Sequence, residues 1–176
     1  MTGTTSGAGA RPLMIRLDDR DPGAVDPDIV GGKAAALARL VRSGHPVPDG
    51  VVLTTEAYRR SIPAGGPIDP EGPPADDAEI DRWFDDRELP CEVRSIVDRI
   101  AADAGGLLAV RSSATGEDAA LAAFPGQYRS LLDVSPDELG AALRRVWESL
   151  WHGAPRAYRL RSDPNGAAPA MAVIVM

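Results

Sequence analysis

Three apolar runs of strand length set the strongest limit on how this 176-residue chain can fold. They are Val51–Leu53, Leu107–Val110 and Met171–Val175. Segments with helical spacing of apolar residues lie between them, for example Ala34–Ser43, where Leu37, Leu40 and Val41 share one face. A chain of this length holds roughly one domain. The pattern therefore predicts one packed domain that contains both strands and helices.

Composition and charge exclude several classes of protein. The chain is 44% hydrophobic and 26% charged, as ordinary globular proteins are. Its formal net charge of −7 argues against a protein that grips nucleic acid or an anionic membrane through a positive field. The longest uncharged run, Pro164–Met176, is too short to span a bilayer, and residues 1–12 lack the features of a secretory signal. We therefore expect a cytoplasmic protein with no nucleic-acid or membrane partner.

The domain is expected to cover residues 13–176, after a flexible N-terminal arm of small and polar residues at 1–12. Residues 62–78 are rich in proline and glycine and lose the apolar period, so they predict a long surface loop. The single cysteine, Cys91, allows no internal disulfide. We expect it to be a small core residue of a helix in a reducing compartment.

Two helix starts carry clear capping patterns. Ser135 is followed by Pro136 in the first turn and by Glu138 three places on, which predicts a reciprocal capping box. Thr54 follows a strand candidate and is a candidate N-cap for the helix after it. Two further strand candidates and one further helix are predicted at Met14–Leu17, Tyr128–Val134 and Pro90–Ala104.

The first candidate phosphate site is Gly31-Gly32-Lys33, at the start of the helix through Ser43. Glycines let the backbone approach an anion closely, a helix N-terminus contributes its positive dipole end, and Lys33 adds a full charge. The spacing differs from that of a P-loop, because the first glycine and the hydroxyl residue after the lysine are both absent. A tight turn with a solvated lysine is the alternative interpretation.

The second candidate site is Ala109–Asp118, followed by Phe124-Pro125-Gly126-Gln127. A buried strand is expected to end at Arg111 and so to hold the guanidinium at its C-terminal tip. The hydroxyls of Ser112, Ser113 and Thr115 follow in a turn of small residues, where they could surround phosphate oxygens. The alternative is an ion pair between Arg111 and the acids Glu117 and Asp118.

The run RSSATGEDAALAAFPGQ resembles the signature of one family of nucleotide-binding domains, found in phosphoenolpyruvate synthase, pyruvate phosphate dikinase and rifampicin phosphotransferase. The resemblance continues upstream through VGGKAAALARLVRSGHPVPDGVVLTTEAYRR. It continues downstream through VWESLWHGAPRAYR and the final MAVIV. In all it covers about residues 29–60 and 107–176, and several motifs in the same order are more specific than any one of them.

This resemblance implies the first subdomain of an ATP-grasp fold. The fold class is α+β, with a mixed sheet flanked by helices, and it is incomplete relative to the full fold. Matched positions make Lys33 and Arg111 the catalytic cations on the ATP phosphates, Gly126 the residue of closest approach to the nucleotide, and Ser130 a hydroxyl ligand. The same motifs add further expected cofactor-binding residues: Gly32, Ser112, Ser113, Thr115 and Gln127.

The resemblance also implies parts that this sequence does not contain. The family has a second nucleotide-binding half with acidic Mg²⁺ ligands and a swivelling phosphohistidine domain, which we expect in cis or in trans. No His, Cys or carboxylate pair here has metal-ligand spacing, so no metal site is expected in this chain. His45 is expected in a surface loop and His152 beside a helix C-terminus.

Two functions from different classes follow. The first is the ATP-binding portion of a dikinase-type phosphotransferase, in which ATP phosphorylates a catalytic histidine elsewhere. Such a portion is expected to bind nucleotide weakly by itself and to turn over nothing. The second is a non-catalytic remnant or split-gene subunit that acts as a structural or interaction partner.

Overall fold

The computed structural model describes residues 11–63, 66–67, 76–115, 128–156 and 169–176. The expected N-terminal arm therefore lies almost wholly outside the described residues. The described strands are β1 (Met14–Arg16), β2 (Val51–Leu53), β3 (Leu108–Ala114), β4 (Ser130–Val134) and β5 (Met171–Val175). The helices are α1 (Pro27–Arg42), α2 (Thr55–Ser61), α3 (Asp77–Asp85), α4 (Cys91–Asp103) and α5 (Leu139–Glu148), with 3₁₀ turns η1 (Pro22–Val25) and η2 (Pro136–Glu138). This mixture confirms the expected α+β class.

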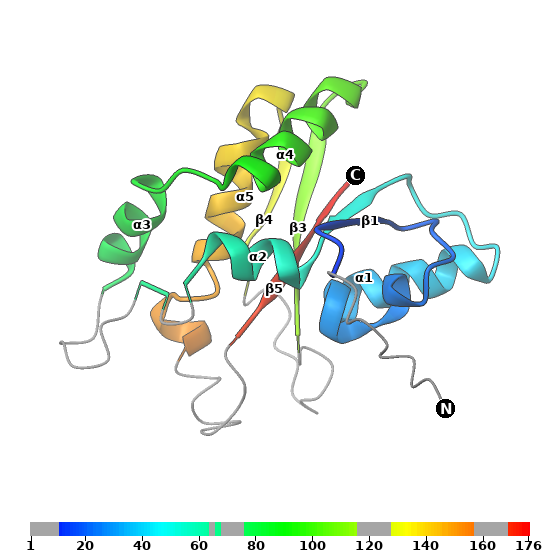
Figure 1. Cartoon of the computed structure of the whole chain (residues 1–176), viewed down its shortest axis with the longest axis horizontal. Helices are drawn as coiled ribbons and strands as arrows, with labels where there is room; N and C mark the ends of the chain where they lie inside the picture. The colour runs from blue at the N-terminus through cyan, green and yellow to red at the C-terminus, as the bar shows by residue number, and fades with distance from the viewer. Residues whose placement is uncertain (1–10, 64–65, 68–75, 116–127, 157–168) are drawn as a thin grey trace, which may run out of the picture.

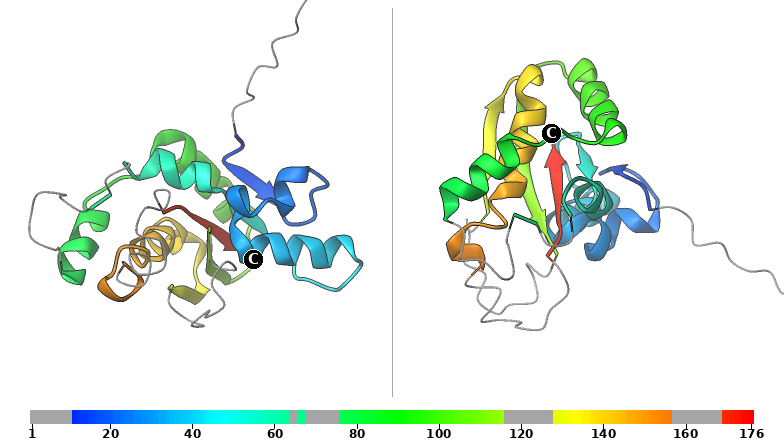
Figure 2. Two further views of the ribbon diagram at one scale, coloured as in Figure 1. Left: turned by 90° about the horizontal axis from the view of Figure 1, so that it is seen from below. Right: turned by 60° about the vertical axis from the view of Figure 1, so that its left-hand side comes forward.

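The five strands form one sheet in the order β1-β2-β5-β3-β4. All four neighbouring pairs are antiparallel, which corrects the expectation of a mixed sheet among the described strands. Strands β2 and β3, which a helical crossover connects, run parallel to each other, because each is antiparallel to β5. They are not neighbours, however, because β5 inserts between them and runs antiparallel to both, as its central position in Figure 2 shows.

Helices cover both faces of the sheet (Figure 1). On one face, α1 packs small side chains such as Ala34 and Ala38 against Ala172 and Ile174 of β5. On the other face, helices α2, α3, α4 and α5 enclose a larger core that includes the fully buried Trp147. Every residue of β5 is therefore buried, and the run MAVIV is apolar without alternation. No helix in the described part of the chain is long and apolar enough to cross a membrane.

Both capping predictions are confirmed. The Thr54 side chain accepts a hydrogen bond from the Glu56 N–H at 3.2 Å. Ser135 and Glu138 form the predicted capping box, although the first turn is the 3₁₀ turn η2 and α5 begins after it. The local side-chain chemistry that starts these two elements is thus readable in the sequence.

Two local predictions are wrong. The strand expected at Leu107–Val110 continues as β3 to Ala114, so Arg111 lies in the middle of a strand and not at its tip. Strand β5 pairs with all five residues from Val110 to Ala114, and this pairing extends β3. Cys91 is exposed, because the buried stripe of α4 runs through Val93 and Val97, and a position two residues from that stripe faces the other way.

Candidate functional site

Helix α1 is interrupted at Gly31, whose φ of 75° and ψ of 166° are not helical. The interruption separates a first turn at Pro27–Val30 from the main helix, which carries Lys33 near its start. A Cβ atom at Gly31 would lie 2.0 Å from the carbonyl oxygen of Ser113 in β3. The helix start can approach the strand this closely only because residue 31 has no side chain.

The Ser113 hydroxyl of β3 forms hydrogen bonds with both parts of α1, before and after Gly31. It accepts a hydrogen bond from the Ala34 N–H at 3.0 Å and donates one to the Val30 carbonyl at 2.8 Å. If Gly31 is the N-cap of the main helix, Ala34 is the third helical residue, whose N–H an N-cap side chain commonly satisfies. Ser113, on strand β3, thus supplies the N-terminal cap that Gly31, which has no side chain, cannot provide. Its hydroxyl is fully buried and already engaged in the protein.

Lys33 and Arg111 lie at one small hollow of about 190 Å³. Ala36 and Leu37 of α1 and Ile174 of β5 complete its described lining. Both cationic residues are exposed. The structure therefore brings two positive charges from distant parts of the sequence to one hollow with small and apolar walls. This arrangement suits a polyanion that approaches from solvent.

Ser130 faces the same side of the sheet as Arg111. The two residues are direct partners in the β3–β4 ladder, and cross-strand partners point to the same face. Ser130 is also exposed. Gly32 is buried directly before Lys33. Ser130 thus lies beside Arg111, and Gly32 lies beside Lys33, although neither lines the described part of the hollow. Their role in binding a cofactor stays a prediction.

The other expected ligands are not all brought to this place. Ser112 alternates with Arg111 along β3 and so points to the opposite face, where its hydroxyl is buried without a partner among the described residues. The Thr115 hydroxyl donates to the Ala170 carbonyl at 3.2 Å. Gly126 and Gln127 lie outside the described residues, and so do Glu117 and Asp118, the alternative ion-pair partners of Arg111.

A second polar cluster was not predicted. His152 Nε2 lies 2.8 Å from Asp81 Oδ1, a contact between α3 and the turn after α5. This corrects the expectation that His152 contacts a helix C-terminus. Glu148 adjoins them and pairs through Oε1 with Arg129 NH1 at 2.6 Å. Burial, followed by the negative charge of Asp81, raises the pKa of Glu148 from its usual value near 4.5 to about 7. The spacing of Glu148 and His152, four residues apart, is a signal that the sequence analysis missed. The sequence gives no signal for Asp81, because α3 is far from both residues in the chain.

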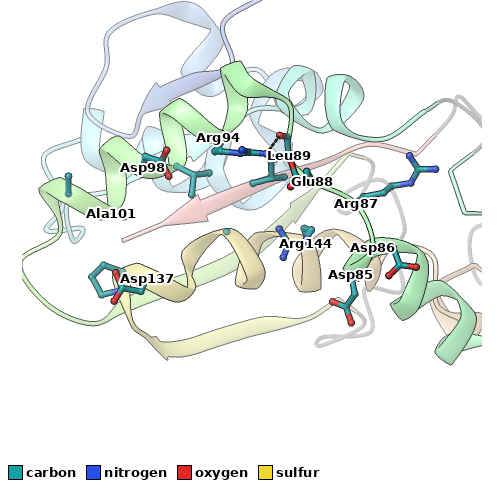
Figure 3. A pocket seen from close by; sticks show the side chains of 14 residues that line it. Asp85, Asp86, Arg87, Glu88, Leu89, Arg94, Asp98, Ala101, Asp137 and Arg144 are labelled. Carbon is teal, nitrogen blue, oxygen red and sulfur yellow. Dashed lines mark hydrogen bonds and ion pairs between the residues drawn. The ribbon is translucent and has the colours of Figure 1, made fainter.

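A larger hollow lies elsewhere, between α4 and α5 (Figure 3). It measures about 840 Å³ and carries both signs of charge, with Arg94 and Asp98 on α4 opposite Arg144 of α5. None of the expected site residues lines it. Its mixed charges indicate no particular class of ligand. The smaller hollow, which Lys33 and Arg111 line, therefore remains the candidate site.

Comparison with known proteins identifies the family to which this chain is similar. The family model for the pyruvate phosphate dikinase AMP/ATP-binding domain matches residues 27–176. Phosphoenolpyruvate synthase from Aeropyrum pernix is 33% identical in an alignment of 189 positions that covers 94% of this chain and 23% of that protein. Rifampicin phosphotransferase from Streptomyces sviceus is 34% identical, over 84% of this chain and 19% of that enzyme. The chain thus spans about a fifth of the length of these curated relatives.

The observed sheet and helices are consistent with the N-terminal subdomain of an ATP-grasp-like fold. The motifs around Lys33 and Arg111 lie inside the matched range, and the two side chains meet at one hollow. On this evidence the chain belongs to the family of pyruvate phosphate dikinase AMP/ATP-binding domains.

Proposed function

We propose that this chain is the ATP-binding portion of a dikinase-type phosphotransferase, from which a phosphoryl group passes toward a catalytic histidine in another domain. The observation that carries the proposal is the convergence of Lys33 and Arg111 on one hollow of a chain from an ATP-binding family. We place this activity in the cytoplasm, where ATP is available.

Lys33, Arg111 and Ser130 would each contact the phosphates in a different way. The Lys33 ammonium is a compact charge near the start of the main helix, where the helix dipole is also positive. The Arg111 guanidinium can hold two phosphate oxygens at once. The Ser130 hydroxyl beside it can donate a hydrogen bond to a third oxygen. Together they would stabilise the negative charge of the transferring phosphoryl group.

Mg²⁺ does not fit the described residues of this hollow. Its described lining contains two cations and three apolar residues but no carboxylate, the ligand that Mg²⁺ prefers in proteins. We therefore expect the acidic metal ligands in the second ATP-grasp half. That half and a phosphohistidine domain would act in cis or in trans, and this chain spans about a fifth of its relatives. Alone, it is expected to bind ATP weakly and to transfer nothing. A chain that binds no ATP would support the alternative of a non-catalytic structural subunit.

The test is a calorimetric titration of ATP into the chain and into Lys33→Ala and Arg111→Ala. Loss of a charge-assisted hydrogen bond is worth about 1.5–3 kcal/mol, so each variant should bind roughly ten to a hundred times more weakly. Arg99→Ala, which removes an exposed cation on α4, is the matched control and should bind as the wild type does. Equal affinity for ATP in all four proteins would contradict the assignment of Lys33 and Arg111 to the phosphate site. Thermal unfolding of each variant checks that the fold is kept.

A further inference from the structure

The polar cluster between α3 and the end of α5 has the composition of a metal site. Asp81 lies on α3, Glu148 is the last residue of α5, and His152 lies in the turn that follows. Each offers one ligand atom, and these atoms all lie within 4.8 Å of one another. No other group of three such residues meets this condition in the part of the chain that the structure describes.

We propose that Asp81, Glu148 and His152 bind a divalent transition-metal ion, of which Zn²⁺ is the representative. An imidazole nitrogen with two carboxylate oxygens is a mixed donor set that suits Zn²⁺ and its first-row neighbours. Three protein ligands also leave a fourth tetrahedral position for water.

The distances are compatible with this assignment. Zn–N and Zn–O bonds of about 2.1 Å place adjacent ligands of a tetrahedron about 3.4 Å apart. The His152–Asp81 contact of 2.8 Å is shorter than this separation, and the limit of 4.8 Å for the group is longer. Rotations of the side chains about their own bonds can make up differences of this size. The backbone of the two helices need not move.

The charge of the cluster favours a cation. Glu148 is only 3% exposed, and a buried carboxylate requires a positive partner. Arg129 provides one at Glu148 Oε1. The cluster nevertheless holds two carboxylates, Asp81 and Glu148, and Arg129 is the one arginine or lysine that pairs with either of them among the described residues. A carboxylate has a second oxygen, and a metal ion bound there would supply the positive charge that is still lacking.

Other hydrogen bonds hold the ligand-bearing segments in place. The Gly153 N–H, next to His152, donates to Asp77 Oδ1 at 2.8 Å and so joins the turn after α5 to the start of α3. The Ser149 hydroxyl, next to Glu148, accepts from the Arg129 N–H at 3.0 Å. These bonds hold the backbone segments that carry the ligands. The ion would therefore require side-chain rotations and no movement of the helices.

The experiment uses the untagged, chelator-treated chain in a Cys91→Ser background, because an exposed thiol also binds Zn²⁺. Zn²⁺ is titrated by calorimetry without ATP, and Co²⁺ is added separately so that its visible absorption reports the coordination geometry. We expect one ion per chain and a tetrahedral Co²⁺ spectrum that Zn²⁺ displaces. His152→Ala should weaken Zn²⁺ binding at least tenfold. His45→Ala, which removes the other of the two histidines, should leave binding unchanged.

Several outcomes would overturn the proposal: no bound ion, an affinity that His152→Ala leaves unchanged, or binding lost equally in His45→Ala. Asp81→Asn is the second variant if His152→Ala does not fold. It keeps the size of a side chain that is partly exposed and removes only the charge. Zn²⁺ should also raise the melting temperature of the parent chain but not that of Asp81→Asn. A rise of equal size in both would show that the ion binds elsewhere.

Discussion

Gly31 and Ser113 approach so closely that a Cβ atom on residue 31 would lie 2.0 Å from the Ser113 carbonyl oxygen and 2.4 Å from its hydroxyl oxygen. This contact sets the distance between the start of the main α1 helix and β3. Because Lys33 lies two residues after Gly31 and Arg111 two residues before Ser113, the contact also sets how near the two cations can come. The candidate phosphate site therefore depends on a residue without a side chain.

The first prediction concerns Gly31→Ala. The new methyl group would overlap the β3 backbone, which cannot move without breaking its ladder to β5. We expect a loss of at least about 3 kcal/mol in the free energy of unfolding, measured with urea. Gly44→Ala is the matched control, since Gly44 has nearly the same φ of 78° but no atom within 4 Å of its Cβ position. It should lose only about 1–2 kcal/mol of backbone strain. Equal losses would show that the close approach to Ser113 adds nothing.

The second prediction compares two neighbouring serines that are both fully buried. Ser113→Ala removes two hydrogen bonds and leaves the Ala34 N–H and the Val30 carbonyl without them, at a cost of about 1–3 kcal/mol. The Ser112 hydroxyl has no partner among the described residues, so Ser112→Ala should be as stable as the wild type or more stable. Urea denaturation of both variants measures the difference. A reversed order would contradict the placement of the two side chains on opposite faces.

The third prediction concerns the exposed position of Cys91. A disulfide reagent such as DTNB should label one thiol per folded chain, without denaturant and at the rate of a small-molecule thiol. Cys91→Ser gives the background signal and should change the free energy of unfolding by less than about 0.5 kcal/mol. Labelling that begins only in denaturant would restore the expectation of a core cysteine.

The fourth prediction is a pH dependence at the start of α5. The Ser135 hydroxyl donates to Glu138 Oε2 at 2.6 Å, and this bond lowers the pKa of Glu138 below its usual value. A carboxyl with a lower pKa when folded stabilises the fold above its unfolded pKa and loses that contribution as the pH falls through its folded pKa. The advantage of the wild type over Ser135→Ala should therefore shrink from pH 6 to about pH 3. Ser95→Ala, which removes a bond to the Cys91 carbonyl, should show a difference without this shrinkage.

Sequence reasoning succeeded where neighbouring residues decide the structure. The Ser135–Glu138 box and the Thr54 cap are set by contacts within one turn, and both were predicted. The same reasoning expected Arg111 at a strand end, because no local pattern shows that β5 will pair with β3 as far as Ala114. The opposite faces of Ser112 and Ser113 could have been predicted from the period of two, if the strand had been extended by three residues.

The second cluster depends on packing between distant segments. Asp81 and His152 meet only because α3 packs against α5 and the Gly153 N–H joins the turn after α5 to Asp77. His152 and Glu148, four residues apart, do have the spacing of a ligand pair, but no local pattern places Asp81 beside them. Glu148 looks like an ordinary helix acid in the sequence, and only its burial distinguishes it. Three-dimensional proximity and the loss of solvent are the two quantities that a linear pattern does not contain.

The central place of β5 also has a consequence for biosynthesis. Of the described strands, Met171–Val175 leaves the ribosome last, yet it joins the β1–β2 half of the sheet to the β3–β4 half. Until then, β2 and β3 each present an unpaired edge to other nascent chains and to chaperones. The two halves can become one cooperative unit only after this segment has cleared the exit tunnel, so the sheet is completed by its last described strand and is not built up in chain order.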